Sequence, residues 1–408
     1  MLFSSLEFLI FLPTVFLLYW FVFQKNLRVQ NLLLLISSYV FYGWWDYRFL
    51  SLIFLSTIVD YFVGLKIHDS DDKKKKKSYL WISILFNLGL LGFFKYFNFF
   101  IENISYLTGW EGPLFKIALP LGISFFTFQQ IAFLISYFRN EIRDVSFIDY
   151  LLFVSFFPQL IAGPIVSQNQ FFPQLKKNKY LTINFYNFNL GFFLFSLGLF
   201  KKTVLIDPYT PYLDILFEQA ANGYYLSPLD AWTATIGYTF QIYFDFSGYS
   251  DMALGLALIF GIRLPFNFFS PYKAENIQEF WRRWHITLSN FLRDYLYIPF
   301  GGSRHGQTRT VFALLVTMFL GGLWHGAGWT FVVWGLYHGA LLGIHSLWVQ
   351  YTDSNKLLKL FKTRQSYRML SILITFTIVS LGWVFFRSFD LSTAFRILLS
   401  FRIFSASL

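Results

Sequence analysis

The sequence predicts an all-helical, multi-pass membrane protein with about ten to twelve membrane segments. Hydrophobic residues make up 56% of the chain and charged residues only 13%, which is about half the charged share of an ordinary soluble domain. Apolar runs recur along most of the sequence, and a helix needs about 20 such residues to cross the hydrocarbon core. The basic residues gather mostly in short loops between these runs, as they do in the cytoplasmic loops of membrane proteins.

The candidate membrane segments are apolar runs that follow one another from the N-terminus. They lie at 6–23, 30–45, 49–67, 79–100, 114–138, 147–166, 184–200, 229–262, 310–326, 328–348 and 368–387. The first run has no basic residues before it, and bulky residues follow where a signal peptidase needs small ones. We therefore expect a retained first helix and not a cleaved signal. Several other runs are short or contain Pro or Gly, so not all of them are expected to cross fully.

We expect these segments to form a single membrane domain with four consecutive parts. Residues 1–145 supply the N-terminal helices, 146–262 the central segments, 263–309 an amphipathic region on the cytoplasmic side, and 310–408 the last helices. The five lysines at 73–77 are predicted to form a solvated cytoplasmic loop, because short basic loops stay on the inner side of a membrane.

Proline and glycine interrupt two of the apolar runs. The run FVSFFPQLIAGPIV (153–166) contains Pro158, Gly163 and Pro164. Proline removes a backbone donor and breaks a helix, and broken backbone at membrane depth requires protein or a water-filled cavity around it. We therefore predict a re-entrant element and a central cavity here. The stretch LPLGISFF (119–126) is predicted to be a second broken segment.

The stretch FWRRWHITLSNFLRDY (280–295) concentrates charge beside two tryptophans in this charge-poor chain. On a single helix over 276–297, at about 100° per residue, its aromatic and leucine side chains share one face, which is predicted to lie against protein or in the membrane interface. A narrower polar seam beside that face consists of Arg282, His285, Ser289 and Arg293. Either this seam binds lipid phosphate, or it receives a phosphorylated carrier and leads it to a histidine.

A second polar cluster lies in GGLWHGAGWTFVVWGLYHGALLGIH (321–345). His325 stands in an apolar run with glycines on both sides. Ionisable residues at membrane depth are costly and point to function, and glycines leave room for a substrate or let backbones approach closely. A neutral imidazole there accepts a proton from a hydroxyl and acts as a general base. His338 and His345 share a face of the next helix and are expected to be packing histidines, although a functional role for them stays open.

The residues that the chain lacks exclude several kinds of chemistry. It has no cysteine, so disulfides, thiolate nucleophiles and Cys-ligated metals are ruled out. No G-x-S-x-G, H-E-x-x-H or Walker A pattern and no dense His/Asp/Glu set occurs, so neither a bound metal nor nucleotide hydrolysis is implied. The net charge of +11 fits basic membrane loops, and no nucleic-acid partner is expected.

Several stretches together resemble the membrane-bound O-acyltransferase (MBOAT) family, and within it the bacterial branch of alginate and peptidoglycan O-acetyltransferase membrane components. The D-alanyl transfer protein of teichoic acid belongs to a related branch. The match runs over most of residues 1–390. The stretches are YGWWDYRFL, LPLGISFFTFQQIAFLISYFRN, FFPQLIAGPIV, QIYFDFSGYSDMALGLALIFGI, FWRRWHITLSNFLRDYLYIPFGG and GGLWHGAGWTFVVWGLYHG. The chain departs from the usual pattern at Ser136, where relatives often have an acidic residue, and at Ser167, where they often have a basic one.

The resemblance implies a ring of helices around a thin centre, with a funnel from the outside and a tunnel from the cytoplasm. His325, in the WHG motif, would be the catalytic base, and His285, in the RWH motif, would be the second functional histidine, on the cytoplasmic side of the tunnel. The expected donor-binding residues are Arg282, Ser289, Arg293 and Trp324. Either His285 or the Trp324 indole N–H would stabilise the oxyanion.

The implied reaction moves an acetyl group from acetyl-CoA, as a substrate and with no bound cofactor, to an envelope polysaccharide such as an alginate-like polymer or peptidoglycan. A secreted SGNH-type partner is expected to complete the transfer, and the expected location is the lipid bilayer of the bacterial inner membrane. Three alternatives stay open. They are D-alanyl or other acyl transfer to a cell-wall polymer, a transporter or flippase without chemistry, and a structural subunit that only docks a secreted partner.

Overall fold

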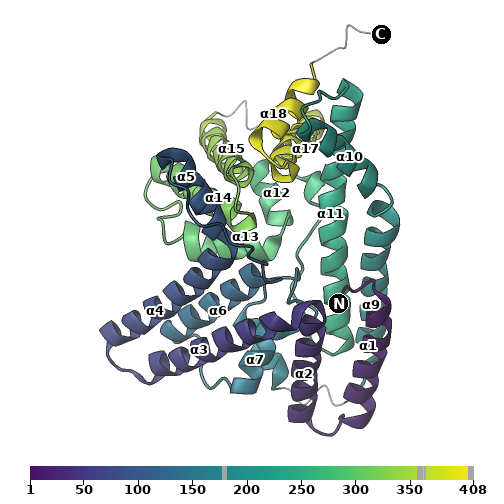
Figure 1. Cartoon of the computed structure of the whole chain (residues 1–408), viewed down its shortest axis with the longest axis vertical. Helices are drawn as coiled ribbons and strands as arrows, with labels where there is room; N and C mark the ends of the chain where they lie inside the picture. The colour runs from purple at the N-terminus through teal and green to yellow at the C-terminus, as the bar shows by residue number, and fades with distance from the viewer. Residues whose placement is uncertain (177–181, 356–361, 363, 403–408) are drawn as a thin grey trace. The chain divides into compact units, whose positions relative to one another are not determined.

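The computed structural model describes residues 1–176, 182–355, 362 and 364–402. Throughout these residues the regular secondary structure is helical, with no strand. The predicted all-helical class is therefore confirmed. The chain divides into two compact units, one made of Met1–Phe200 and Gly248–Pro265 and the other of Lys201–Ser247 and Phe266–Leu408. The helices of both units are labelled in Figure 1.

The first unit holds the N-terminal helices, and several of them continue through short π- or 3₁₀-helical turns. Its elements are α1 (Leu6–Leu17), η1 (Leu18–Val22), α2 (Leu27–Asp46), η2 (Tyr47–Phe49), α3 (Leu50–Asp69), α4 (Lys73–Leu91), η3 (Gly92–Tyr96), α5 (Phe97–Thr108), α6 (Ile123–Phe138), α7 (Phe147–Ser155), α8 (Gln168–Leu175) and α9 (Phe185–Phe200). The last part of the long helix α11 (Pro228–Ile259) also belongs to it. Figure 1 shows α3, α4 and α6 side by side, and all three pack on one another.

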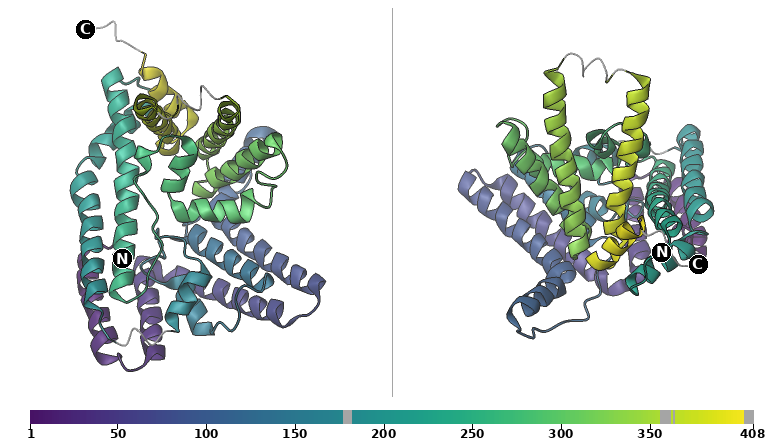
Figure 2. Two further views of the ribbon diagram at one scale, coloured as in Figure 1. Left: turned by 180° about the vertical axis from the view of Figure 1, so that it is seen from behind. Right: turned by 90° about the horizontal axis from the view of Figure 1, so that it is seen from above.

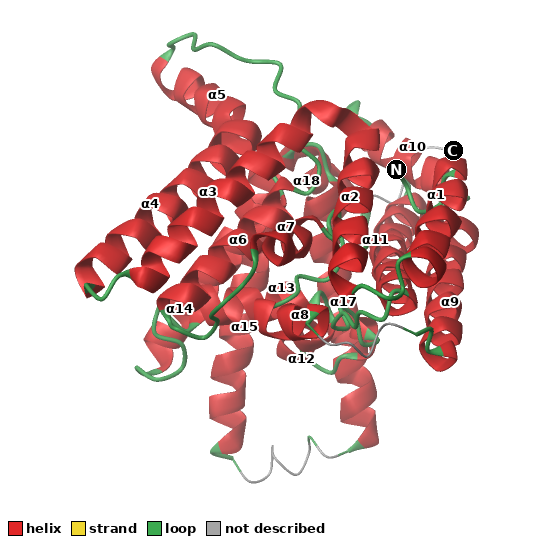
Figure 3. Cartoon of the chain, turned by 90° about the horizontal axis from the view of Figure 1, so that it is seen from below, coloured by secondary structure: helices red, strands yellow, loops and turns green. Residues whose placement is uncertain are grey.

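The second unit holds the remaining helices and the first part of α11. Its other elements are η5 (Lys201–Ile206), α10 (Thr210–Ala221), η6 (Pro271–Lys273), α12 (Ile277–Arg283), α13 (Ile286–Leu292), η7 (Arg293–Tyr297), α14 (Gln307–His325), α15 (Trp329–Asp353), α17 (Gln365–Arg387) and α18 (Leu391–Ser400). Helices α15 and α17 lie side by side, as the right-hand view of Figure 2 and Figure 3 both show.

Five helical stretches of the described chain are long and apolar enough to cross a membrane. They are Leu27–Asp69, Lys73–Thr108, Phe185–Ile206, Trp329–Asp353 and Gln365–Arg387. A multi-pass membrane protein is therefore the right class. The predicted total of ten to twelve segments stays a prediction, because length and composition alone do not decide whether shorter helices cross.

The lysine run does not form the loop that its charge predicted. Lys73 begins α4, and the following lysines form its first turns. Asp72 caps this helix, because its side chain accepts a hydrogen bond of 2.8 Å from the Lys74 N–H. Lysine is a good helix former, and a capping aspartate supplies a partner for an otherwise unpaired N–H. Local helix propensity therefore extends the helix into a charged segment that stays mostly exposed.

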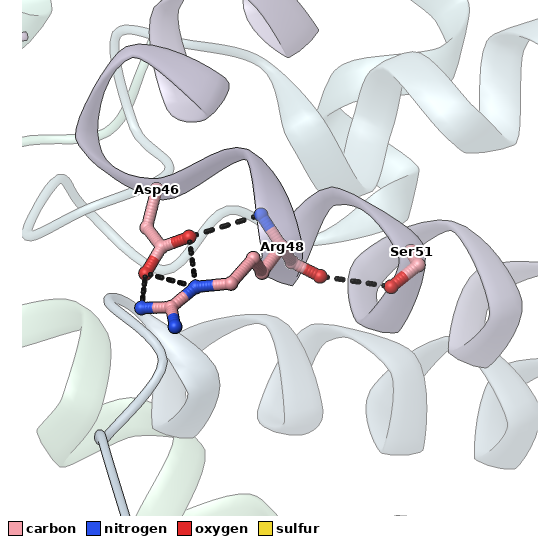
Figure 4. A network of polar contacts seen from close by, with 3 residues as sticks. All are labelled: Asp46, Arg48 and Ser51. Carbon is pink, nitrogen blue, oxygen red and sulfur yellow. Dashed lines mark hydrogen bonds and ion pairs between the residues drawn. The ribbon is translucent and has the colours of Figure 1, made fainter.

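The connection between α2 and α3 is a tight polar turn (Figure 4). The Arg48 guanidinium donates to both oxygens of the Asp46 carboxylate, with its shortest contact at 2.6 Å. The same carboxylate accepts the Arg48 backbone N–H at 3.0 Å, and the Ser51 hydroxyl donates to the Arg48 carbonyl at 2.8 Å. These contacts cap the first turn after α2, where the chain changes direction within a few residues.

The two segments predicted from proline and glycine to be broken both contain non-helical backbone, at 156–166 and at 119–122, and these parts pack together. Helix α7 ends at Ser155, and no helix follows until α8 begins at Gln168. Helix α6 begins only after Gly122, which has a φ of 73°. A Cβ on Gly122 would lie 2.6 Å from the Leu160 carbonyl oxygen, so only glycine fits. The predicted helix breaks are thus confirmed, and the re-entrant path of the chain stays a prediction.

Candidate functional site

The hairpin of α14 and α15 carries His325 and is held together by glycines. A Cβ on Gly322 would lie 2.3 Å from the Phe331 carbonyl oxygen, and a Cβ on Gly335 would lie 2.4 Å from the Met318 carbonyl oxygen. The two helix backbones therefore touch, which side chains at these positions would prevent. This close approach holds the end of α14 tightly against the start of α15.

His325 is the last residue of α14, and its partly buried ring lies in an aromatic box. Its ring centroid lies 4.9 Å from that of Trp324, 5.0 Å from Trp334 and 5.0 Å from Phe386. These neighbours come from α14, α15 and α17.

His285 does not lie within one continuous helix, as the sequence pattern predicted. Helix α12 ends at Arg283, His285 has a left-handed conformation with φ 41° and ψ 55°, and α13 begins at Ile286. The prediction of one helix over 276–297 is therefore wrong. Periodicity detects a shared apolar face, but it does not detect one left-handed residue that turns the chain between two short helices.

The turn at His285 is stabilised by an asparagine that the sequence analysis did not single out. The His285 Nδ1 lies 3.0 Å from the Asn267 Oδ1. The same oxygen accepts hydrogen bonds from the Thr287 hydroxyl at 3.0 Å and from the Thr287 backbone N–H at 3.3 Å. An oxygen acceptor at Nδ1 places the imidazole proton there and makes Nε2 the ring's acceptor nitrogen. No sequence motif marks Asn267, because its role arises only from the fold.

His285 is enclosed on its other sides by aromatic rings. Its side chain is 1% exposed, and its ring lies edge-on to Phe246 at 4.7 Å and near Trp324 at 6.3 Å. Burial lowers the pKa of His285 to about 3, because the charged imidazolium loses its hydration. His285 is therefore neutral at physiological pH. Trp324 stands between it and His325, because it contacts both histidine rings.

A cavity of about 530 Å³ lies beside this region, within the second unit. Arg282, Ser289 and Arg293 all line it, although the helix break moves His285 away from them. Both arginines are exposed, and Arg293 pairs with Asp294 at 2.7 Å. Other lining residues are Trp281, Thr317, Leu342 and His345. Three of the four predicted seam residues thus share one cavity, while the fourth is buried elsewhere. His325 and Trp324 are not among its lining residues.

Comparison with known protein families identifies the family to which this chain belongs. The model of the membrane-bound O-acyltransferase family matches residues 122–386. The chain belongs to the MBOAT family. It is therefore a membrane acyltransferase, and the matched range contains both His285 and His325.

Three relatives show how the similarity is distributed within the MBOAT family. The peptidoglycan O-acetyltransferase of Helicobacter pylori is 43% identical, over 95% of this chain and 77% of the relative. The probable alginate O-acetylase AlgI of Azotobacter vinelandii is 39% identical, over 97% of this chain and 77% of the relative. The teichoic acid D-alanyltransferase of Streptococcus thermophilus is 28% identical, over 66% of this chain and 68% of the relative.

The two other histidines of α15 differ in their surroundings. His338 is fully buried among aromatic rings. His345, two turns further along α15, is only partly buried and lines the cavity. The aromatic residues Trp334 and Phe386, which enclose His325, escaped the sequence analysis because they lie on different helices.

Proposed function

We propose that this protein transfers acetyl groups from acetyl-CoA to hydroxyls of an envelope polysaccharide, such as peptidoglycan or an alginate-like polymer. The observation that carries the proposal is the position of His325, at the carbonyl end of α14 within an aromatic box. The names of the two more similar relatives, an O-acetyltransferase and an O-acetylase, support acetyl over D-alanyl as the transferred group.

In the proposed reaction His325 acts as the general base. Its neutral imidazole takes the proton of an acceptor hydroxyl while the oxygen attacks the thioester carbonyl of the donor. The tetrahedral intermediate collapses by breaking the C–S bond, and the imidazolium returns the proton to the departing thiolate. The products are the acetyl ester and free CoA. No acyl-enzyme is needed, in keeping with a chain that has no cysteine.

The donor is proposed to bind through its phosphates. Arg282 and Arg293 line one cavity and are exposed there, with Ser289 between them. Guanidinium groups bind phosphate oxygens through paired, charge-assisted hydrogen bonds. Trp324, which touches the His325 ring, is the proposed N–H donor to the oxyanion, and His285 is proposed to hold Trp324 in place from its other side.

The acetyl group is proposed to leave on the outer side of the bacterial inner membrane, where a secreted SGNH-type partner passes it to the final sugar. Transfer of D-alanine or another acyl group is the second candidate function, favoured by the similarity to a teichoic acid D-alanyltransferase. Purified protein in vesicles separates these candidates. Acetyl-CoA should release free CoA when a peptidoglycan or alginate fragment and the SGNH-type partner are added, whereas a D-alanyl transferase, a transporter or a purely structural subunit would release none.

Replacement of His325 by alanine tests the catalytic assignment. General-base catalysis contributes about 10²–10⁴-fold, so His325→Ala should lower CoA release by at least about 100-fold without changing the unfolding temperature of the protein greatly. His305→Ala is the matched control, because His305 is exposed between η7 and α14. Near-normal transfer by His325→Ala would contradict the assignment of His325 as the general base.

A further inference from the structure

His338 is a buried histidine whose ring nitrogens both lack a hydrogen-bond partner among the described residues. Its side chain is completely buried on α15. Its ring centroid lies 4.9 Å from that of Trp334 and 5.4 Å from that of Trp281. The α17 backbone also comes close, since a Cβ on Gly382 would lie 3.0 Å from the His338 Nε2. A polar ring is thus enclosed by apolar surroundings.

Packing alone does not explain a histidine at this position. A buried polar group without a partner lowers stability, and leucine has a similar volume without that cost. Natural proteins break such local rules mainly at functional sites. The two nitrogens of a neutral imidazole are one donor and one acceptor, so His338 is equipped to bind a group that offers both.

Other buried polar atoms without a partner among the described residues lie between His338 and the cavity and between His338 and His325. Within the described part of the chain, the Thr317 hydroxyl and the indole N–H groups of Trp281 and Trp334 are buried without a hydrogen-bond partner. Thr317 and Trp281 line the cavity, and Trp334 contacts the His325 ring at 5.0 Å. His338 contacts both tryptophans. These groups therefore connect the cavity with His325.

The distance along α14 from the cavity-lining Thr317 to His325 suits an extended ligand better than a compact one. Thr317 and His325 are eight residues apart on α14, which is a rise of about 12 Å at about 1.5 Å per residue. The outer part of the same cavity presents Arg282 and Arg293. A ligand that fits has an anionic head and a long arm with hydrogen-bonding groups along it.

We propose that His338 is a substrate-binding residue that hydrogen-bonds an amide in the arm of the acyl-CoA donor. The proposal rests on the proposed function. Amides offer both carbonyl acceptors and N–H donors, so an amide group fits either nitrogen of neutral imidazole. The Thr317 hydroxyl and the indole N–H groups of Trp281 and Trp334 donate hydrogen bonds to carbonyl oxygens along the same arm. Trp281 stands between the cavity and His338, so its indole turns aside when the arm is bound.

A phospholipid is the other ligand that combines an anionic head with a long arm carrying carbonyl groups. A glycerophospholipid carries esters, which accept hydrogen bonds but do not donate them. A bound glycerophospholipid therefore provides no donor for the acceptor nitrogen of His338. The amide-containing donor therefore fits His338 better than the ester lipid does.

The test compares His338→Leu with His338→Gln in the full chain, reconstituted in vesicles. His338→Leu removes both nitrogens at similar size, whereas His338→Gln keeps a donor and an acceptor. We expect His338→Leu to unfold at the same or a higher temperature and to raise the KM for acetyl-CoA about tenfold, since one hydrogen bond is lost. The thermal stabilisation of the protein by free CoA should fall in parallel. His338→Gln should restore most of both properties.

Two further variants complete the experiment. Thr317→Val should also raise the KM for acetyl-CoA, by a few fold, and it decides the outcome if His338→Leu does not fold. Tyr150→Phe is the matched control, because it removes a buried hydroxyl that likewise has no partner among the described residues but lies in the first unit. It should leave the KM and the stabilisation by CoA unchanged.

An unchanged KM and an unchanged stabilisation by CoA in His338→Leu overturn the proposal, and so does a loss of kcat alone. If, in detergent solution, added phospholipid stabilises the wild-type protein but not His338→Leu, while CoA has no effect on either, His338 binds a lipid and the proposal is also wrong. Failure of the wild-type protein to use acetyl-CoA at all would instead contradict the proposed function, which keeps the two failures distinct.

Discussion

At the residue scale, His285 and His325 illustrate two ways of holding a histidine. His325 ends α14, and its ring packs among aromatic rings from neighbouring helices. His285 occupies a left-handed turn, which costs a non-glycine residue about 1–2 kcal/mol. Its contact with the Asn267 oxygen helps to offset that cost. Burial and the Asn267 contact keep the His285 ring neutral and fixed.

Acid should destabilise the protein through His285. Its pKa is about 3 in the folded protein and about 6.5 in an unfolded chain. Between these values the unfolded chain binds a proton that the folded protein does not bind, so stability is full above about pH 6.5 and falls by up to about 1.4 kcal/mol per pH unit below it. His285→Asn, which tolerates the left-handed turn, should show a shallower decline of the unfolding temperature between about pH 6 and 4. Equal slopes for both proteins would contradict this expectation.

The two exposed arginines of the cavity should control donor affinity. Arg282→Ala and Arg293→Ala should each raise the KM for acetyl-CoA about 5–30-fold, since a charge-assisted hydrogen bond contributes about 1–2 kcal/mol, and should leave kcat nearly unchanged. The effect should weaken at high salt, because exposed charges are screened. Arg304→Ala is a suitable control at an exposed position outside the cavity lining. If neither variant changes the KM, the arginines only anchor the protein to lipid phosphate.

At the scale of elements, close backbone packing at glycines and buried hydrogen bonds join individual pairs of helices. Helices α14 and α15 touch backbone to backbone at glycines, and α3 and α4 are joined by a buried polar cluster. In that cluster the Asp60 carboxylate accepts hydrogen bonds from the Ser83 hydroxyl and, at 2.9 Å, from the Asn87 amide. Small residues and buried hydrogen bonds are the usual means of helix association where lipid surrounds the protein.

Gly335→Ala should destabilise the α14–α15 hairpin. The added Cβ would lie 2.4 Å from the Met318 carbonyl oxygen, a backbone atom that a side-chain movement does not relieve. Such overpacking costs about 1–3 kcal/mol, and it should also lower activity, because His325 lies at the end of this hairpin. Gly89→Ala in α4 is the matched control, since its Cβ meets nothing within 4 Å. The unfolding temperature and the rate of CoA release should both fall for Gly335→Ala, and neither should fall for Gly89→Ala.

Asp60→Ala should weaken the contact between α3 and α4. The substitution leaves the buried Ser83 hydroxyl and Asn87 amide without the oxygens that they now contact, and a buried polar group without a partner costs about 1–3 kcal/mol. We expect a lower unfolding temperature and faster proteolysis near 70–72, between these helices. Asp71→Ala, at an exposed position, should change neither measurement. An unchanged unfolding temperature in Asp60→Ala would show that the cluster contributes no stability.

At the scale of the whole molecule, composition and local pattern predicted the class and the helix breaks. Hydrophobic content predicted a multi-pass helical membrane protein, and Pro158, Gly163 and Pro164 predicted the break after α7. The lysines at 73–77 were wrongly predicted to form a loop, because charge indicates exposure and does not oppose helix formation.

The candidate site was predictable in its residues but not in its geometry. The motifs around His285 and His325 indicated the family and the kind of chemistry from sequence alone. The tertiary structure decided that His285 faces Asn267 while Arg282, Ser289 and Arg293 share a cavity. It alone placed His338 between Trp281 and Trp334. The physical reason is that periodicity reports which side chains share a face of one helix, whereas contacts between helices depend on backbone turns and close packing that no local pattern encodes.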